Sequence, residues 1–150
     1  MTGTSQSGFF GVYPMLLADY RADSELALPP FLHETRGELD IFVGLAGPEA
    51  PEVLRAGTTG LIPGFETLDH MSEQSDCLQE GRDEDAEAVC RSIELALVFM
   101  LKSINHFVTY SREVAGRRLG HEAIHHQLGV DVSPLGLSIA KRFARQFGPL

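Results

Sequence analysis

The sequence predicts a mainly helical protein with one small β element, and an α+β fold is the alternative class. Two observations predict this. Residues 84–115 start within the acidic run 83–87 and have an apolar middle, as expected of a long central helix. Residues 39–45 are rich in β-branched and aromatic side chains and are followed by Ala-Gly-Pro, which favours a short strand.

Length and composition predict one soluble domain. The chain has 150 residues, 43% of them hydrophobic and 22% charged, which is typical of globular proteins. We expect a disordered tail at residues 1–8 and a single domain over 9–150. The longest apolar run, 95–101, is too short to span a bilayer, and no signal peptide is visible at the start. These features predict a cytoplasmic protein without a membrane partner, in which Cys77 and Cys90 are reduced thiols.

The long central helix predicts an interface. Between residues 93 and 108 it is apolar around most of its circumference, which is typical of a helix that is central to a fold or shared between subunits. Because a chain of this size offers limited material to cover such a helix, we expect it to contact another subunit. The side chains expected at that interface are Leu97, Met100, Leu101, Ile104, Phe107 and Val108.

Two shorter helices are expected at the carboxyl end. Residues 121–128 form the first, which Gly129 ends. The second covers 135–147 and follows Ser133-Pro134, a helix cap with proline at the first helical position. It presents a basic stripe on its polar side, made of Lys141, Arg142 and Arg145, which we expect to bind an anion or an acidic partner.

Charge is distributed unevenly along the chain. The net charge is −9, but residues 1–101 carry 18 acidic and 5 basic side chains (−13) and residues 102–150 carry 3 acidic and 7 basic ones (+4). The basic end of one subunit could therefore pack against the acidic segment of another. Together with the apolar helix, this predicts an interaction module that self-associates or docks into a larger protein assembly.

A second hypothesis comes from the sequence His121-Glu122-Ala123-Ile124-His125, which has the H-E-x-x-H pattern of zincins. On a helix, His121 and His125 would share one face and bind zinc, and Glu122 would act as general base on metal-bound water. Asp131 is the candidate third ligand, although Leu128 stands where the metzincin pattern has glycine. This pattern predicts a zinc hydrolase; apart from zinc, no cofactor is expected.

A third hypothesis is a DNA-binding regulator. The helix expected at 121–128, a turn and the helix at 135–147 have the outline of a helix-turn-helix, with Lys141, Arg142 and Arg145 facing phosphates and base edges. Arg112, Arg117 and Arg118 would extend the positive surface. The strongly acidic remainder of the chain opposes this function, because it would repel nucleic acid.

Overall fold

The computed structural model describes residues 40–44, 49–124 and 131–150. The tail expected at 1–8 lies outside these residues, as does most of the helix expected at 121–128. The described residues are mainly helical and include a small sheet, as the sequence predicts. None of their helices is both long and apolar enough to cross a membrane.

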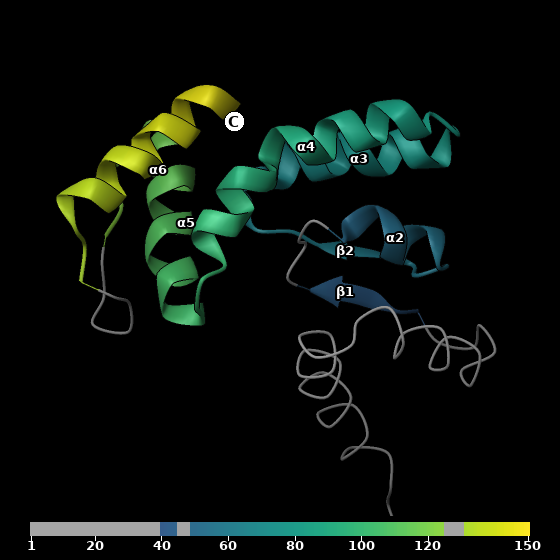
Figure 1. Cartoon of the computed structure of the whole chain (residues 1–150), viewed down its shortest axis with the longest axis horizontal. Coiled ribbons are helices and arrows are strands. Elements are labelled where there is room, and N and C mark those ends of the chain that lie inside the picture. Colours follow the sequence, from purple (N-terminus) through teal and green to yellow (C-terminus); the bar gives the residue numbers. More distant parts are fainter. Residues whose placement is uncertain (1–39, 45–48, 125–130) are drawn as a thin grey trace, which may run out of the picture.

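The small sheet contains two parallel strands. Strand β1 (Phe42–Gly44) pairs with β2 (Gly60–Ile62), with Val43 opposite Leu61, and β1 falls within the predicted segment 39–45. Helix α2 (Ala50–Arg55) lies between them in the sequence, because parallel strands need a crossover connection. Figure 1 shows this unit beside α3 and α4, and α2 contacts both helices.

An antiparallel pair of helices follows the sheet. A 3-10 turn, η1 (Phe65–Thr67), leads into α3 (Leu68–Gln79), and α4 (Asp83–Met100) returns alongside it. The turn between the two helices contains Gly81, whose φ of 73° lies in the left-handed region that favours glycine. Three carboxylates in the first turn of α4 complement the helix dipole, as expected from the acidic run in the sequence.

The central helix expected over 84–115 is divided into two. Helix α4 ends at Met100 and α5 (Ile104–Arg118) begins after a three-residue break. Ser103 causes the break: its backbone is extended, and its side chain accepts a hydrogen bond from the backbone N–H of His106 at 3.1 Å. A serine that caps a new helix in this way competes with continuation of the old one.

Helices α5 and α6 (Pro134–Phe147) lie side by side and run in the same direction. Tyr110, in the middle of α5, contacts the amino end of α6. Its hydroxyl accepts a hydrogen bond from the backbone N–H of Ser133, and it lies so close to Gly136 that no Cβ would fit there. At the carboxyl ends of the two helices, Arg118 donates to the carbonyl of Gly148 at 2.8 Å. Ser133 caps α6 and Pro134 occupies its first turn, which confirms the predicted start signal.

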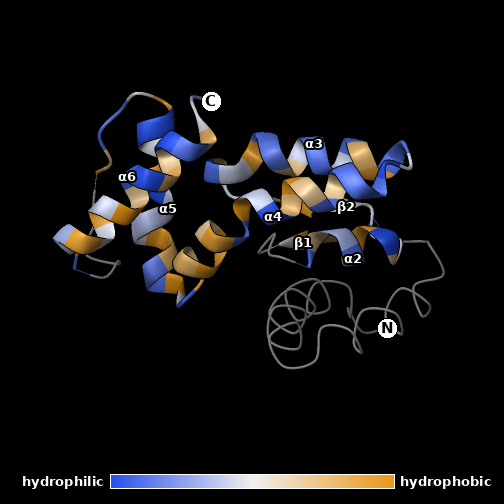
Figure 2. Ribbon diagram, turned by 45° about the horizontal axis from the view of Figure 1, so that its top comes forward, coloured by the Kyte–Doolittle hydropathy of each residue, from blue (hydrophilic) through white to orange (hydrophobic). Residues whose placement is uncertain are grey.

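One hydrophobic core joins the two helix pairs. In Figure 2 the apolar positions of α4, α5 and α6 lie on the sides of these helices that approach one another. Phe99 near the end of α4 contacts Tyr110 of α5 and Phe143 of α6, with ring centroids 5.1 and 5.9 Å apart. The largest contributors from α4 are Ile93, Leu97, Phe99 and Met100. The core therefore surrounds the carboxyl half of α4.

Candidate functional site

The H-E-x-x-H segment does not form a helix where the structure describes it. Residues 121–124 are non-helical, and His125 lies outside the described residues. After α5 ends, the chain folds back along it: the backbone N–H of His121 donates to the carbonyl of Gly116 at 2.8 Å. The helical geometry that the zinc site requires is therefore not formed at His121 and Glu122. Both side chains are exposed.

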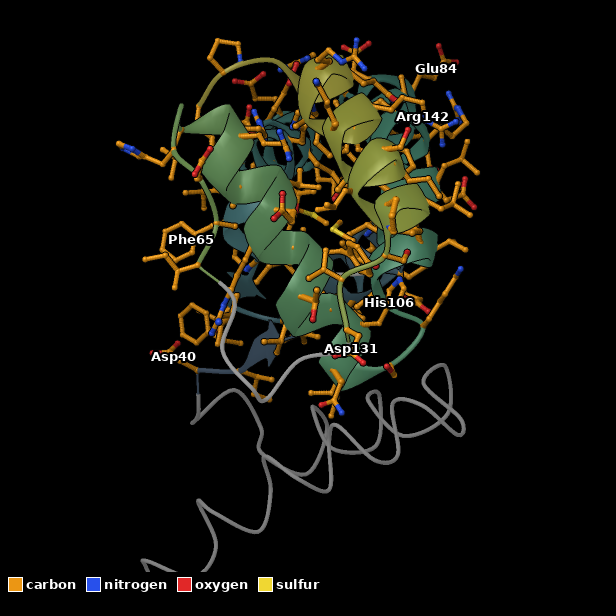
Figure 3. All side chains as sticks on the ribbon, turned by 90° about the vertical axis from the view of Figure 1, so that its left-hand side faces the viewer. Asp40, Phe65, Glu84, His106, Asp131 and Arg142 are labelled. Carbon is orange, nitrogen blue, oxygen red and sulfur yellow. The ribbon has the colours of Figure 1, made fainter. Side chains whose placement is uncertain are left out.

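Asp131, the candidate third ligand, lies far from His121. His121 lines a cleft with Arg145 and Gly148, at the carboxyl end of α6. Asp131 precedes the amino end of the same helix, as Figure 3 shows. The 14 helical residues of α6 separate the two ends by about 20 Å. One ion cannot bind both side chains in this arrangement, and the described residues contain no cluster of three metal-ligating side chains.

The helix-turn-helix outline is not formed at the described start of its first helix, and residues 125–130 lie outside the described residues. Residues 121–124, where its first helix should begin, are not helical, and the preceding helix α5 runs parallel to α6 with residues 119–133 between them. Arg118 was expected to extend the positive surface, but it is only 3% exposed and is held in an ion pair with Asp69. Residues 121–124 therefore do not begin the expected helix, and Arg118 does not contribute to an exposed positive surface.

The six side chains expected at an interface lie in different environments. Leu97 and Met100 are fully buried in the core of the chain itself. Leu101, Phe107 and Val108 are half-buried, and the first two pack against that core. Ile104 is exposed at the start of α5. Because buried side chains present no surface to a partner, a docking face on α4 must use other residues.

Such residues lie on the outer side of α4. Leu95 is 71% exposed and Val98 is 56% exposed, although both are large and apolar. They belong to a row of exposed positions that we call the outer stripe, made of Glu84, Ala88, Arg91, Leu95, Val98 and Lys102. The opposite side of α4 is buried at Ala86, Cys90, Ile93, Leu97 and Met100. This helix therefore has one buried apolar face and, on its other side, two large apolar residues that no other described part of the chain buries.

A basic cleft lies at the joined carboxyl ends of α5 and α6. Its volume is about 640 Å³, and its lining includes Arg117, Arg118, Lys141 and Arg145 together with His121 and Glu122. The cleft therefore joins two of the three predicted anion-binding residues to the first two residues of the H-E-x-x-H segment. Arg142, the third, instead lies over the Phe143 ring on the exposed side of α6 (Figure 3).

The cations of this cleft have a structural role. Arg117 donates to Glu113 at 3.1 Å, and Arg118 is paired with Asp69. Both helices end at the cleft, where unpaired carbonyl groups carry partial negative charge and cations are stabilising. Lys141 and Arg145 lie on successive turns of α6, and Arg145 donates to the carbonyl of Lys141 at 3.3 Å. The dipoles of the two helices therefore offer a structural reason for several cations to gather at this cleft.

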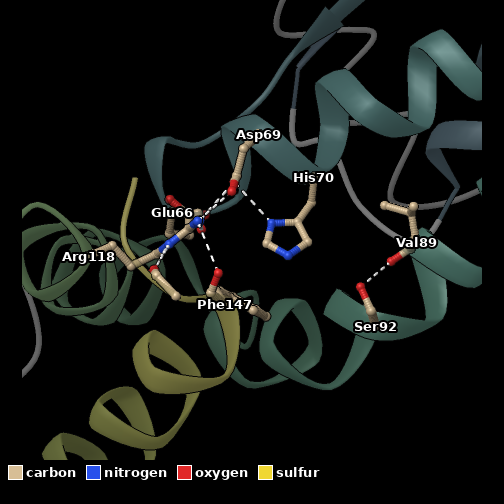
Figure 4. Close-up of polar contacts among 8 residues, drawn as sticks. Glu66, Asp69, His70, Val89, Ser92, Arg118 and Phe147 are labelled. Carbon is tan, nitrogen blue, oxygen red and sulfur yellow. Dashed lines mark hydrogen bonds and ion pairs between the residues drawn. The ribbon is translucent and has the colours of Figure 1, made fainter.

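Arg118 holds three segments together (Figure 4). Its guanidinium group donates to both carboxylate oxygens of Asp69 at the start of α3, and to the backbone carbonyl of Glu66 at 2.7 Å. It also donates to the carbonyls of Phe147 and Gly148 at the end of α6. The hydrogen bonds that Arg118 donates to the Asp69 carboxylate hold the pKa of this carboxyl well below its usual value, and His70 contributes in the same direction. We call this cluster the Arg118 joint.

Glu66 is a second buried charged group beside the joint. It is almost completely buried, and the hydroxyl of Ser111 donates to its carboxylate at 2.5 Å. Burial raises the pKa of the Glu66 carboxyl above its usual value, and this effect outweighs the hydrogen bond from Ser111 and the attraction of Arg118, both of which act in the opposite direction. Burial of this carboxylate in its ionised form therefore destabilises the fold.

Sequence reasoning missed both the outer stripe and the Arg118 joint. Leu95 and Val98 lie within the apolar stretch 93–108, and their hydrophobicity alone does not distinguish them from the side chains that are buried. The charges on their stripe were the available signal, because Glu84, Arg91 and Lys102 interrupt it and no charge interrupts the buried side. No comparable signal marked the partners of Arg118, which lie 49 and 52 residues away in the sequence.

Comparison of the chain with protein-family models, with curated proteins and with solved structures finds no significant match.

The Arg118 joint predicts a large effect of a conservative substitution. We expect Arg118→Lys to lower the free energy of unfolding by about 2–4 kcal/mol, because an ammonium group cannot reach four acceptors in fixed directions and leaves buried carbonyls unpaired. Urea denaturation measures this value. Arg112→Lys, on the exposed side of α5, is the matched control and should change it by less than about 0.5 kcal/mol. Equal effects of the two variants would contradict the assigned role of Arg118.

The burial of Glu66 predicts a pH dependence. A raised pKa means that the folded chain binds a proton where the unfolded chain has lost it, so this group's contribution to stability falls as the pH rises above its usual value of 4.5. Glu66→Gln removes this titration. We therefore expect the stability of Glu66→Gln relative to the wild type to increase as the pH is raised above 4.5, measured by urea denaturation at each pH. Glu73→Gln, on the exposed side of α3, controls for loss of charge. A relative stability of Glu66→Gln that is constant or decreases with pH would refute the account.

Proposed function

We propose that this chain is a small helical protein-interaction module that docks through the outer stripe of α4. One observation carries the proposal: Leu95 and Val98 are large, apolar and more than half exposed, on a helix whose other side is already buried in the core. Covering a side chain of this kind contributes about 1.5–3 kcal/mol. Two such residues with their neighbours could therefore supply most of the free energy of a modest interface.

The surroundings of the stripe support a protein partner. Charged residues flank the apolar pair on both sides along the helix, with Glu84 and Arg91 before it and Lys102 after it. Interfaces commonly combine an apolar centre with a polar rim, and the rim sets orientation more than affinity. Because the apolar centre would supply most of the free energy, we expect binding to weaken only modestly with salt.

The proposed function is the one expected from the sequence, but different residues carry it. The exposed row on α4 replaces the expected set around Leu97 and Met100, which are buried in the core. Of the expected set, Ile104 is exposed, and it follows Lys102 by two residues in the sequence. The basic stripe of α6 would contribute charge rather than the main contact.

Thiol reactivity tests the proposal even while the partner is unidentified. Leu95→Cys and Leu135→Cys place a cysteine at two leucines that are equally exposed, at 71% and 72%, on different helices. The native Cys77 and Cys90 are buried, and burial raises the pKa of the Cys90 thiol, so both should react slowly. In dilute purified protein, we expect a maleimide to label the two variants at similar rates.

In an extract of the source cells, we expect Leu95→Cys to react at least about fivefold more slowly than Leu135→Cys, because a partner covers α4 there. The rate for the purified variants provides the control for any intrinsic difference between the two thiols. Equal protection of both positions, or none at Leu95→Cys, would refute docking through the outer stripe.

A further inference from the structure

We propose that the partner on the outer stripe is a second copy of this chain, packed antiparallel across a two-fold axis so that Glu84 of each copy faces Lys102 of the other. This inference rests on the proposed function, because it assumes that the outer stripe is a docking face. It adds the identity of the partner and the register of the contact.

The spacing of the stripe is that of a coiled-coil seam. Its positions, 84, 88, 91, 95, 98 and 102, are separated alternately by four and three residues, and all six are exposed. This is the alternation of the a and d positions of a heptad repeat, which keeps one seam facing a partner helix. The first five positions lie within α4 and the sixth lies two residues after it. The first five positions therefore share one side of α4, and Lys102 follows in the break after it, with its ammonium group 5.4 Å from the centre of the Phe99 ring.

The order of residues along the stripe is complementary to its own reverse. The amino end of the stripe is acidic, Arg91 and Leu95 lie on the two sides of its midpoint, Val98 follows, and the carboxyl end is basic. A parallel pairing would place Glu84 beside Glu84 and Lys102 beside Lys102, with repulsion at both ends. An antiparallel pairing instead places opposite charges together at both ends, and like charges in contact are strongly unfavourable. Charge thus selects a second copy in the antiparallel orientation.

This register also matches the sizes of the side chains between the ends. When Glu84 faces Lys102, Ala88 faces Val98 and Arg91 faces Leu95, so a small residue meets a branched one and the long aliphatic stem of arginine meets leucine. The arginine side chain can cover apolar surface with its stem while its head stays in water. Its head would then lie near Glu94 of the second copy, whose carboxylate has the opposite charge.

Charges next to the stripe limit which residues can act on a second copy. At the acidic end of α4, Asp83 is paired with Arg55 at 3.0 Å and Asp85 with Arg82 at 2.8 Å, so the negative charge that faces a partner there comes mainly from Glu84. At the other end, Arg142 of α6 lies over Phe143, whose ring is 5.9 Å from that of Phe99 in the last turn of α4. The side chain of Gln146 donates to the carbonyl of Ser92 at 2.9 Å, which places the carboxyl end of α6 beside the middle of α4. The opposite charges at the two ends of the docking face are therefore those of Glu84 and Lys102, with Arg142 close to the last turn of α4.

Charge reversal tests the register. Glu84→Lys alone places two lysines opposite each other at both ends of the proposed pair, and Lys102→Glu alone places two glutamates there. We expect each single variant to dimerise at least about tenfold more weakly than the wild type, as measured by sedimentation velocity over a range of concentrations. Mixing the two variants should restore association to within about threefold of the wild type, because every facing pair is then of opposite sign. Glu73→Lys, the same change on the exposed side of α3, is the matched control and should leave the dissociation constant within about twofold.

The outcomes separate this inference from the proposed function. A wild-type chain that stays monomeric up to high micromolar concentration would overturn the second copy as partner, whereas protection of Leu95→Cys in cell extract would still support docking to another protein. Dimerisation that neither single variant weakens, or that mixing does not restore, would overturn the antiparallel register. Loss of dimerisation in both single variants and recovery in the mixture is expected only if residue 84 faces residue 102.

Discussion

The ion pair and hydrogen bonds of Arg118 determine how the helices of this protein are joined. A single buried guanidinium group binds the start of α3, the carbonyl of Glu66 and the last carbonyls of α6. Its burial is tolerated because a carboxylate and several carbonyl oxygens replace the water that it loses. The start of α3 and the ends of α5 and α6 are fixed at this point, and α3 and α5 pack against α4. None of these helices covers the outer stripe, whose residues are exposed.

The proposed function therefore depends on the division of α4 into two faces. The inner face supplies Ile93, Leu97 and Met100 to the core, where α5 and α6 pack on it. A helix that continued beyond Met100 could not return over this face. The break at Ser103 lets α5 leave at an angle and pack beside α6, so the core closes around one side of α4 only.

Local signals in the sequence predicted much of this fold. The mainly helical class is confirmed, β1 lies within the segment expected to form a strand, and α6 begins one residue before the predicted position because Ser133 and Pro134 act locally. The break at Ser103 was missed, although serine is a common helix cap, because the surrounding apolar residues favoured a continuous helix. Whether a serine inside such a run begins a new helix depends on where that helix packs.

The site was less predictable, because it depends on contacts between residues distant in the sequence. Leu95 and Leu97 are equally apolar, and which of them is buried depends on the helices that pack against the inner side of α4, above all α3. Arg118 and Arg117 are adjacent arginines, yet one is buried at the joint and the other is exposed. The H-E-x-x-H spacing was a real local pattern, but the chain bends back at His121, and Asp131 lies at the far end of α6.

The distance between spin labels on the two copies tests the central claim most directly. In the antiparallel register, Glu94 lies next to the two-fold axis, and Asp85 lies about eight residues from the centre of the stripe, so two copies of Asp85 are separated by roughly 24 Å along the helix axis. Pulsed electron paramagnetic resonance measures the distances between labels at Glu94→Cys and between labels at Asp85→Cys. A short distance for Glu94→Cys and a long one for Asp85→Cys is the predicted result, and equal distances for the two positions would contradict the account.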